Sequence, residues 1–253
     1  MIAIIGGTGF YTLDYMDDPQ KINVRTPFGG TTFYQGKYQG EDICFLPRHG
    51  FDHNQLANQV NYRANIWGLH ESGVDRILGT SAVAAMNLDF SVGDLVALDQ
   101  LIDFSRHRRD TFNLGSVNFT DPYCFELRET ILKQAGLLEI DIHPTATYVA
   151  FEGPRYETAA EIRLWKNLGM DVLGMTNGTE AALARELGIC YAVIGIVTNM
   201  GAGLAEEQPN LATHKKVMQD NVEKLKSLTL SALANIPKDH SCECQNLGLK
   251  PAH

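Results

Sequence analysis

The chain lacks several features that would assign it to a class at once. No apolar run approaches the roughly 20 residues of a membrane span, and the N-terminus has no basic start typical of a signal peptide. Positive charge is also scarce, because 21 Lys and Arg residues against 30 Asp and Glu residues give a formal net charge of −9. These absences argue against nonspecific binding to nucleic acid or to an anionic membrane. We expect a cytosolic protein that binds any anion through a few local cations.

Cysteine is sparse, with five residues in 253. Cys44, Cys124 and Cys190 stand alone in apolar surroundings, where a free thiol packs as a small apolar residue. Cys242 and Cys244 lie in a polar C-terminal segment, which we expect to be a mobile tail with two reduced thiols. A disulfide between these two, or half of a metal site, is the alternative, but two ligands do not make a zinc site. The sequence therefore predicts no bound metal.

The chain does have a regular alternation of short β-branched runs and longer amphipathic segments. This alternation predicts a doubly wound α/β sheet with a mixed or distorted core. No linker, repeat or low-complexity block interrupts it, so we expect one domain over residues 1–237 and a polar tail over 238–253. The expected strands span 2–5, 42–46, 76–79, 95–98, 146–151, 172–174 and 190–197, and the expected helices 58–70, 122–134, 158–168, 178–187 and 212–234.

The first strand ends in a glycine turn, Gly6-Gly7-Thr8-Gly9. Such turns direct backbone N–H groups at an anion, usually a phosphate. A dinucleotide-binding dehydrogenase would place a pyrophosphate there, whereas a phosphorylase would place free inorganic phosphate. The turn alone leaves both classes open.

Four further segments carry chemistry near strand ends. Arg48-His49 offers a guanidinium fork and an imidazole for phosphate oxygens, and Gly79-Thr80-Ser81-Ala82 offers hydroxyls and close backbone approach. Met175-Thr176 places a thioether beside a hydroxyl, and Thr198-Asn199 closes the longest apolar strand. Each segment alone is equally typical of a solvated loop or an ordinary turn. Together they indicate one site.

The segment Phe151-Glu-Gly-Pro-Arg-Tyr-Glu-Thr158 is more specific. Gly-Pro predicts a rigid turn, and Thr158 is a good N-cap for the helix that follows. Tyr156 and Glu157 would then be fixed at a loop–helix junction, where an aromatic face beside a carboxylate suits a flat heterocycle with an N–H donor. The alternative is that Tyr156 packs locally and Glu157 complements the helix dipole.

These segments together resemble the family of trimeric purine nucleoside phosphorylases and methylthioadenosine phosphorylases. The similarity runs in order through nearly the whole chain. The matching pieces are Ile5-Gly-Gly-Thr-Gly-Phe10, Thr26-Pro-Phe-Gly29, Arg48-His-Gly50, Val60-Asn-Tyr-Arg-Ala-Asn65, Glu152-Gly-Pro-Arg-Tyr-Glu157, Gly174-Met-Thr176 and Glu180-Ala-Ala-Leu-Ala-Arg185.

The resemblance implies a single α/β domain with a mixed, twisted, partly barrel-like sheet flanked by helices. It also implies a homotrimer, no metal or organic cofactor, and inorganic phosphate as co-substrate of a purine nucleoside. Met175 would lie under the ribose and Tyr156 near the base. The implied phosphate ligands are Thr8, Arg48, His49, Ser81, Thr176 and the backbone of Ala82.

The base pocket departs from the methylthioadenosine branch of that family, which has aspartate and serine where this chain has Asn199 and Glu157. Asn199 can donate to the O6 atom of a 6-oxopurine and accept from N7–H, while Glu157 can accept from N1–H. An aspartate facing O6 would place two hydrogen-bond acceptors, the carboxylate and O6, against each other, a mismatch that can cost about 10⁴-fold in specificity. The pair therefore favours hypoxanthine or guanine over adenine, and with His49 it forms the predicted catalytic set.

The sugar's 5′ substituent is less defined. His214 resembles a histidine that bonds a 5′-hydroxyl in the inosine/guanosine branch, or else it is a helix-surface residue. The rest of the scaffold looks more like the methylthio branch. S-methyl-5′-thioinosine reconciles the two and ranks first, inosine or guanosine second, and methylthioadenosine third.

Two other classes compete with a phosphorylase. An NAD(P)-dependent dehydrogenase or epimerase predicts a third glycine soon after Gly9 and a Tyr-x-x-x-Lys pair on a helix, and neither is present. A noncatalytic nucleoside-binding protein would have little use for Thr8, Arg48 and His49 as a phosphate cradle. Both remain alternatives to a phosphorylase at this point.

Overall fold

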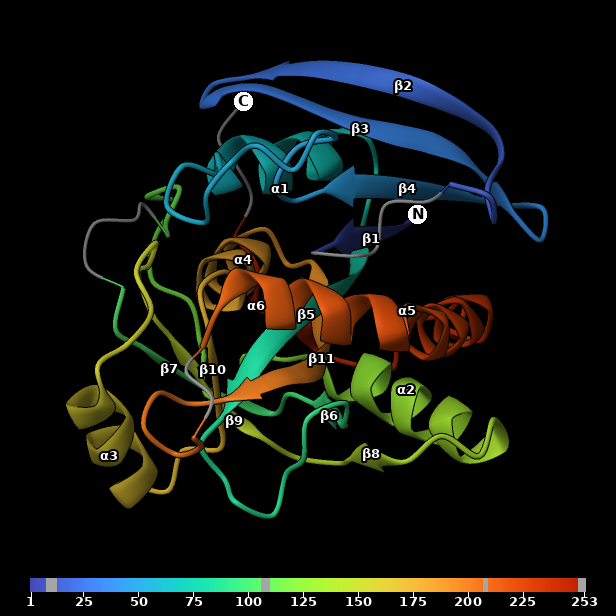
Figure 1. Ribbon diagram of the computed structural model, residues 1–253. Coiled ribbons are helices and arrows are strands. Elements are labelled where there is room, and N and C mark those ends of the chain that lie inside the picture. Colours follow the sequence, from blue (N-terminus) through green and yellow to red (C-terminus); the bar gives the residue numbers. More distant parts are fainter. Residues whose placement is uncertain (8–12, 106–109, 207–208, 250–253) are drawn as a thin grey trace.

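The computed structural model of the protein describes residues 1–7, 13–105, 110–206 and 209–249, and shows a mixed sheet with helices on both faces (Figure 1). Thr8 and Gly9 of the glycine turn lie outside these ranges. The strands are β1 (Ile2–Gly6), β2 (Asp17–Thr26), β3 (Gly29–Tyr38), β4 (Glu41–Pro47), β5 (Arg76–Ala85), β6 (Leu95–Ala97), β7 (Gln100–Asp103), β8 (Ile142–His143), β9 (Thr147–Ala150), β10 (Val172–Gly174) and β11 (Cys190–Met200). The helices are α1 (Tyr62–Glu71), α2 (Phe125–Leu137), α3 (Ala159–Asn167), α4 (Asn177–Glu186), α5 (Leu211–Ala234) and α6 (Cys244–Leu247).

The sheet runs in the order β2-β3-β4-β1-β5-β10-β9-β7, and β11 leaves this path to pair with β5 and β6. β5 is the central strand. It lies parallel to β1 and β11, and its last residues pair antiparallel with β10. One long strand thus has both parallel and antiparallel neighbours, which confirms the mixed fold class.

Two cores explain why the central strands are apolar throughout. Ile5 faces the side covered by α1 and α4, whereas its neighbour Ile4 faces the side covered by α2 and α5. Side chains alternate across a strand, so a sheet covered on both faces needs apolar residues at every position. A third cluster packs α3 against β9 and β10 through Trp165.

Several features differ from the sequence expectations, among them the end of β11, which lies at Met200 rather than at residue 197. β5 does not stop at residue 79 but continues to Ala85, so Ser81 lies within the strand. The hairpin of β2 and β3 was not predicted, because its outer strand is polar and largely exposed. The C-terminal segment is not a mobile tail: Cys244 is buried in α6, and the Leu249 N–H donates to the Glu186 carbonyl at 2.7 Å. No helix among the described residues is both long and apolar enough to cross a membrane.

Candidate active site

The predicted site residues, although far apart in the sequence, line one cavity of about 440 Å³. β4, β5, β10 and β11 contribute residues at or near their C-terminal ends, the loops after β1, β4 and β9 contribute others, and the start of α5 completes the lining. The predicted residues brought together are Arg48, His49, Ser81, Ala82, Tyr156, Glu157, Met175, Thr176, Asn199 and His214. Thr8 lies outside the described residues, but its neighbour Gly7 lines the same cavity.

Arg48 is held rigidly at the end of β4. Its Nε and Nη2 atoms donate to the Glu180 carboxylate, and Nη1 donates to the Thr80 carbonyl at 2.8 Å. Burial opposes the charge, but the ion pair with Glu180 outweighs it and keeps the pKa of Arg48 above its ordinary value. These bonds use three of the five guanidinium N–H groups. Two donors remain for an anion.

The glycine turn is shaped around this guanidinium. A Cβ atom on Gly7 would lie 2.8 Å from Arg48 Nη1 and 2.9 Å from the Thr80 carbonyl oxygen. The Gly7 N–H donates to Thr80 Oγ1 at 3.1 Å, which ties the turn to β5. Only glycine fits between these groups. The described part of the glycine turn, which ends at Gly7, therefore lies beside Arg48, as expected if both contribute to one phosphate site.

Thr176 caps the N-terminus of α4 beside the cavity. Its backbone N–H donates to the Tyr148 hydroxyl, which fixes the end of β10. The positive end of a helix dipole favours an anion. Thr176 and Ser81 are both almost fully buried, and both line the cavity.

His49 follows Arg48 and is half-buried, with Nδ1 2.9 Å from the Gln55 carbonyl oxygen. A carbonyl only accepts, so Nδ1 carries the proton and Nε2 of the neutral ring is an acceptor. The His53 ring centroid lies 4.9 Å from that of His49. His49 is thus oriented by the loop that supplies His53.

Asn199 is positioned by a break in strand pairing. The register of β11 against β5 shifts between Val197 and Asn199, and such bulges redirect side chains. The Thr198 hydroxyl donates to Asn199 Oδ1 at 3.0 Å, and Asn199 Nδ2 donates to the Met200 carbonyl at 2.9 Å. One N–H and one lone pair of the Asn199 amide remain for a ligand.

Glu157 lines the cavity, although only 7% of the residue is exposed. Burial is the main reason that its pKa is raised to about 7. The loop before it is shaped by Gly153, whose φ of +66° is in the left-handed region and where a Cβ would lie 2.5 Å from Met175 Sδ. The predicted turn therefore presses against Met175 and presents Tyr156 and Glu157, while Thr158 caps α3 as expected.

His214 lies in the first turn of α5, whose N-cap Asn210 accepts from the Thr213 N–H. The ring is half-buried in the cavity wall, and burial, followed by nearby His53, lowers its pKa. Burial also lowers the pKa of His53, with Lys215 as the second cause. We call the set His53, Leu56, Leu211, His214 and Lys215 the α5 side of the cavity.

Several contributing residues were not singled out from the sequence. Glu180 was quoted only within a matching segment, yet its carboxylate holds Arg48 and accepts from the Tyr191 hydroxyl at 2.6 Å. A carboxylate directly before the apolar run Ala181-Ala-Leu-Ala184 is the sequence signal that could have found it, since nearly all of α4 is buried. His53 and Lys215 lie in polar segments that resemble ordinary surface.

Comparison with known proteins agrees with this geometry. Residues 1–234 match the phosphorylase superfamily. The chain belongs to this superfamily. It is 43% identical over 256 residues to the 6-oxopurine nucleoside phosphorylase of Pyrococcus furiosus, covering 97% of this chain and 96% of that protein. It is 39% identical over 249 residues to the S-methyl-5′-thioadenosine phosphorylase of Thermofilum pendens, covering 96% and 95%.

The fold is similar to that of solved members of the superfamily. A methylthioadenosine phosphorylase from an antarctic soil metagenomic library superposes with a TM-score of 0.91 at 31% identity, covering 97% of this chain and 90% of that one. The enzyme from Schistosoma mansoni in complex with adenine gives a TM-score of 0.89 at 30% identity, covering 94% and 92%. The predicted fold class is therefore confirmed.

Proposed function

We propose that this phosphorylase superfamily member cleaves purine nucleosides with inorganic phosphate and prefers 6-oxopurine bases. The observation that carries the proposal is the pairing of Glu157 and Asn199 in the cavity that also holds Arg48. A buried carboxylate accepts from N1–H, and the Asn199 amide retains one donor for O6 and one acceptor for N7–H. The identity to a relative named as a 6-oxopurine nucleoside phosphorylase supports the same preference.

In the proposed reaction a phosphate oxygen attacks C1′ of the ribose while the bond from C1′ to N9 of the base breaks. Arg48, Ser81 and Thr176 hold the phosphate beside the sugar, and His49 Nε2 accepts a hydrogen bond from a phosphate hydroxyl. Positioning of the nucleophile supplies much of the rate enhancement. The electron pair of the broken bond passes into the purine, which takes up a proton from solvent at N7, and the Asn199 carbonyl oxygen stabilises this N7–H form by accepting a hydrogen bond from it. The products are the free base and a ribose 1-phosphate.

At the 5′ end we propose inosine and guanosine as the main substrates. His53, His214 and Lys215 give the α5 side three polar groups, which suit a hydroxyl. This reverses the sequence-based ranking, in which S-methyl-5′-thioinosine came first. That nucleoside remains the second candidate because Leu56 and Leu211, 51% and 56% exposed, leave apolar surface on the same side.

A phosphorolysis panel tests the proposal. Inosine, guanosine, S-methyl-5′-thioinosine, methylthioadenosine and adenosine are each incubated with enzyme and phosphate, and kcat/KM is measured from release of the base. We expect all three 6-oxopurine nucleosides to exceed both adenine nucleosides. Equal or greater turnover of the adenine nucleosides would contradict the roles given to Glu157 and Asn199.

A further inference from the structure

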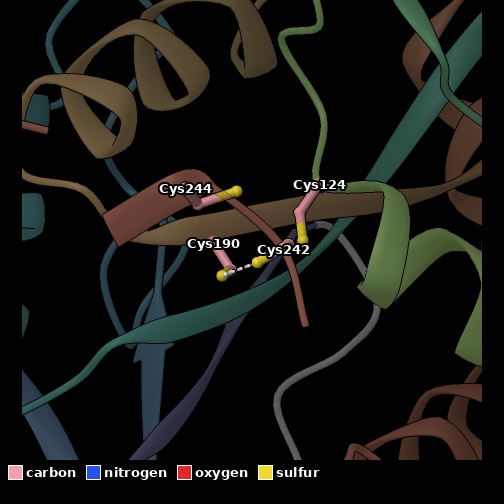
Figure 2. A group of neighbouring side chains, drawn as sticks. All are labelled: Cys124, Cys190, Cys242 and Cys244. Atoms are coloured by element: carbon pink, nitrogen blue, oxygen red, sulfur yellow. Dashed lines mark hydrogen bonds between the residues drawn. The ribbon is translucent and has the colours of Figure 1, made fainter. Parts of the chain in front are cut away.

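Four cysteines from three parts of the chain meet beneath the C-terminal segment. Cys124 is the N-cap of α2, Cys190 begins β11, and Cys242 and Cys244 belong to the last segment. Their sulfur atoms all lie within 4.8 Å of one another. Figure 2 shows the four side chains gathered together, with the contact between Cys190 and Cys242 marked. Cys124 and Cys190 are therefore not the isolated core residues that the sequence suggested.

We propose that these four thiols bind one zinc ion. In a tetrahedral site with Zn–S distances of about 2.3 Å, neighbouring sulfurs are about 3.8 Å apart. The sulfurs of Cys190 and Cys242 are 3.3 Å apart, and no pair in the cluster exceeds 4.8 Å, so small side-chain movements complete the tetrahedron. Cys242 and Cys244 alone do not make a zinc site, but Cys124 and Cys190 bring the number of sulfur ligands to four.

Binding is a ligand exchange without electron transfer. The ion forms four Zn–S bonds, and the four thiols lose four protons to solvent, which leaves a complex of net charge −2. Arg185, almost fully buried, acts electrostatically on Cys244 and offsets part of this charge. His240 Nδ1 lies 3.6 Å from Cys190 Sγ and can support that ligand from outside the tetrahedron.

A neighbouring group of Glu126, His240 and Cys242 also has ligand spacing, but it shares Cys242 with the four-cysteine cluster, and Glu126, through Oε2, and His240 already have other partners. Glu126 Oε2 accepts from the backbone and hydroxyl of Ser241, and His240 Nε2 lies 3.0 Å from the Asp75 carboxylate. Among the described residues, Cys190 Sγ also contacts His240 Nδ1, but at 3.6 Å this contact is longer than the bonds of Glu126 and His240, so the thiols are more accessible to a metal. Four sulfur ligands also match the composition of structural zinc sites.

The expected role is structural. Cys124, Cys190 and Cys244 belong to the core packed by α2 and α5, and none of the four cysteines lines the substrate cavity. A metal there fastens the C-terminal segment to α2 and β11. Its loss should lower stability while leaving the chemistry of the cavity intact.

The test is metal analysis of the full-length protein, produced in zinc-containing medium and purified with reductant and without chelator. We expect about one zinc per chain by elemental mass spectrometry, as structural sites bind one ion. Replacement by cobalt(II) should give the strong absorption bands of tetrahedral thiolate coordination. Zinc removal should lower the Tm and leave kcat/KM unchanged below that Tm.

Variants assign the ligands. The double variant Cys242→Ser, Cys244→Ser should lose the zinc, whereas Cys44→Ala should keep it, because Cys44 belongs to the other hydrophobic core and is not part of the cluster. If the double variant does not fold, the zinc content of the single variant Cys242→Ser, whose side chain is half-buried, and the cobalt spectrum of the unaltered protein test the proposal instead. Metal-free protein as purified, zinc retained by the variants, or an intact mass lower by four hydrogens from two disulfides would each overturn the proposal.

Discussion

At the phosphate side of the cavity, Arg48 is fixed by the Glu180 carboxylate and a strand carbonyl, and its residue is 1% exposed. On the α5 side, His214 and Leu211 come from the first turn of a helix and are half-buried or exposed. The buried ion pair of Arg48 tolerates few substitutions, whereas residues on the α5 side can be substituted with little loss of stability. We infer that the residues around Arg48 determine the phosphate-dependent reaction, and that the α5 side determines which 5′ substituent of the sugar is accepted.

The largest effect is expected on the free energy of unfolding when the Arg48–Glu180 ion pair is broken. Glu180→Gln removes the charge partner of a buried guanidinium, and loss of one partner of a buried pair typically costs about 3–5 kcal/mol. Urea unfolding should show this loss, and KM for phosphate should rise as Arg48 loses its orientation. Glu41→Gln is the control, because its partner Lys238 and Glu41 itself are exposed. Equal stability of both variants would contradict the account of Arg48.

The next effect concerns the base. Asn199→Asp removes the donor to O6 and sets a carboxylate against the Met200 carbonyl oxygen, now 2.9 Å from Nδ2. Loss of one oriented donor typically lowers kcat by about 10²–10³-fold. We expect that loss for inosine and a gain, or a much smaller loss, for adenosine. An unchanged ratio of kcat/KM between the two nucleosides would remove Asn199 from base recognition.

A pH profile sharpens the role of Glu157. The pKa of this carboxyl is raised to about 7 in the folded protein, and only the ionised form accepts N1–H without a competing proton. For inosine, kcat/KM should therefore rise as pH increases through about 7, by about tenfold per unit on the acid limb. Glu157→Gln should flatten this step. A step of the same size in the variant would assign it to phosphate or to another group.

The smallest effect is expected on the α5 side. His214→Leu removes one neutral hydrogen bond to a 5′-hydroxyl, worth about 0.5–1.5 kcal/mol, or up to about tenfold in kcat/KM. Inosine should lose this factor, whereas S-methyl-5′-thioinosine should be unaffected or improve. Equal losses for the two nucleosides would place His214 outside the 5′ pocket.

Much of the sheet could be predicted from the sequence, because strands covered on both faces are continuously apolar. β10 matches its predicted bounds, and Thr158 caps α3 as expected. The polar hairpin of β2 and β3 could not be predicted in this way, since its stability comes from pairing with β4. The end of β5 was also missed, because small residues such as Ser81 have little strand preference outside their pairing with β11.

The gathering of Arg48, Thr176 and Asn199 in one cavity could be predicted because all three lie at or near strand ends, and their roles stay predictions. Glu180 and the four-cysteine cluster were not, because each depends on contacts between segments that are far apart in sequence. The homotrimer and the cytosolic location remain predictions. Light scattering of the purified protein can test the first of them.

The central claim, that one cavity holds both phosphate and a 6-oxopurine nucleoside, is tested most directly by the phosphate dependence of base release. Hypoxanthine release from inosine is followed with and without inorganic phosphate, and ribose 1-phosphate is measured at the end. The account predicts no release without phosphate and one ribose 1-phosphate for each hypoxanthine when phosphate is added. Release that does not depend on phosphate, or NAD binding without any release, would contradict it.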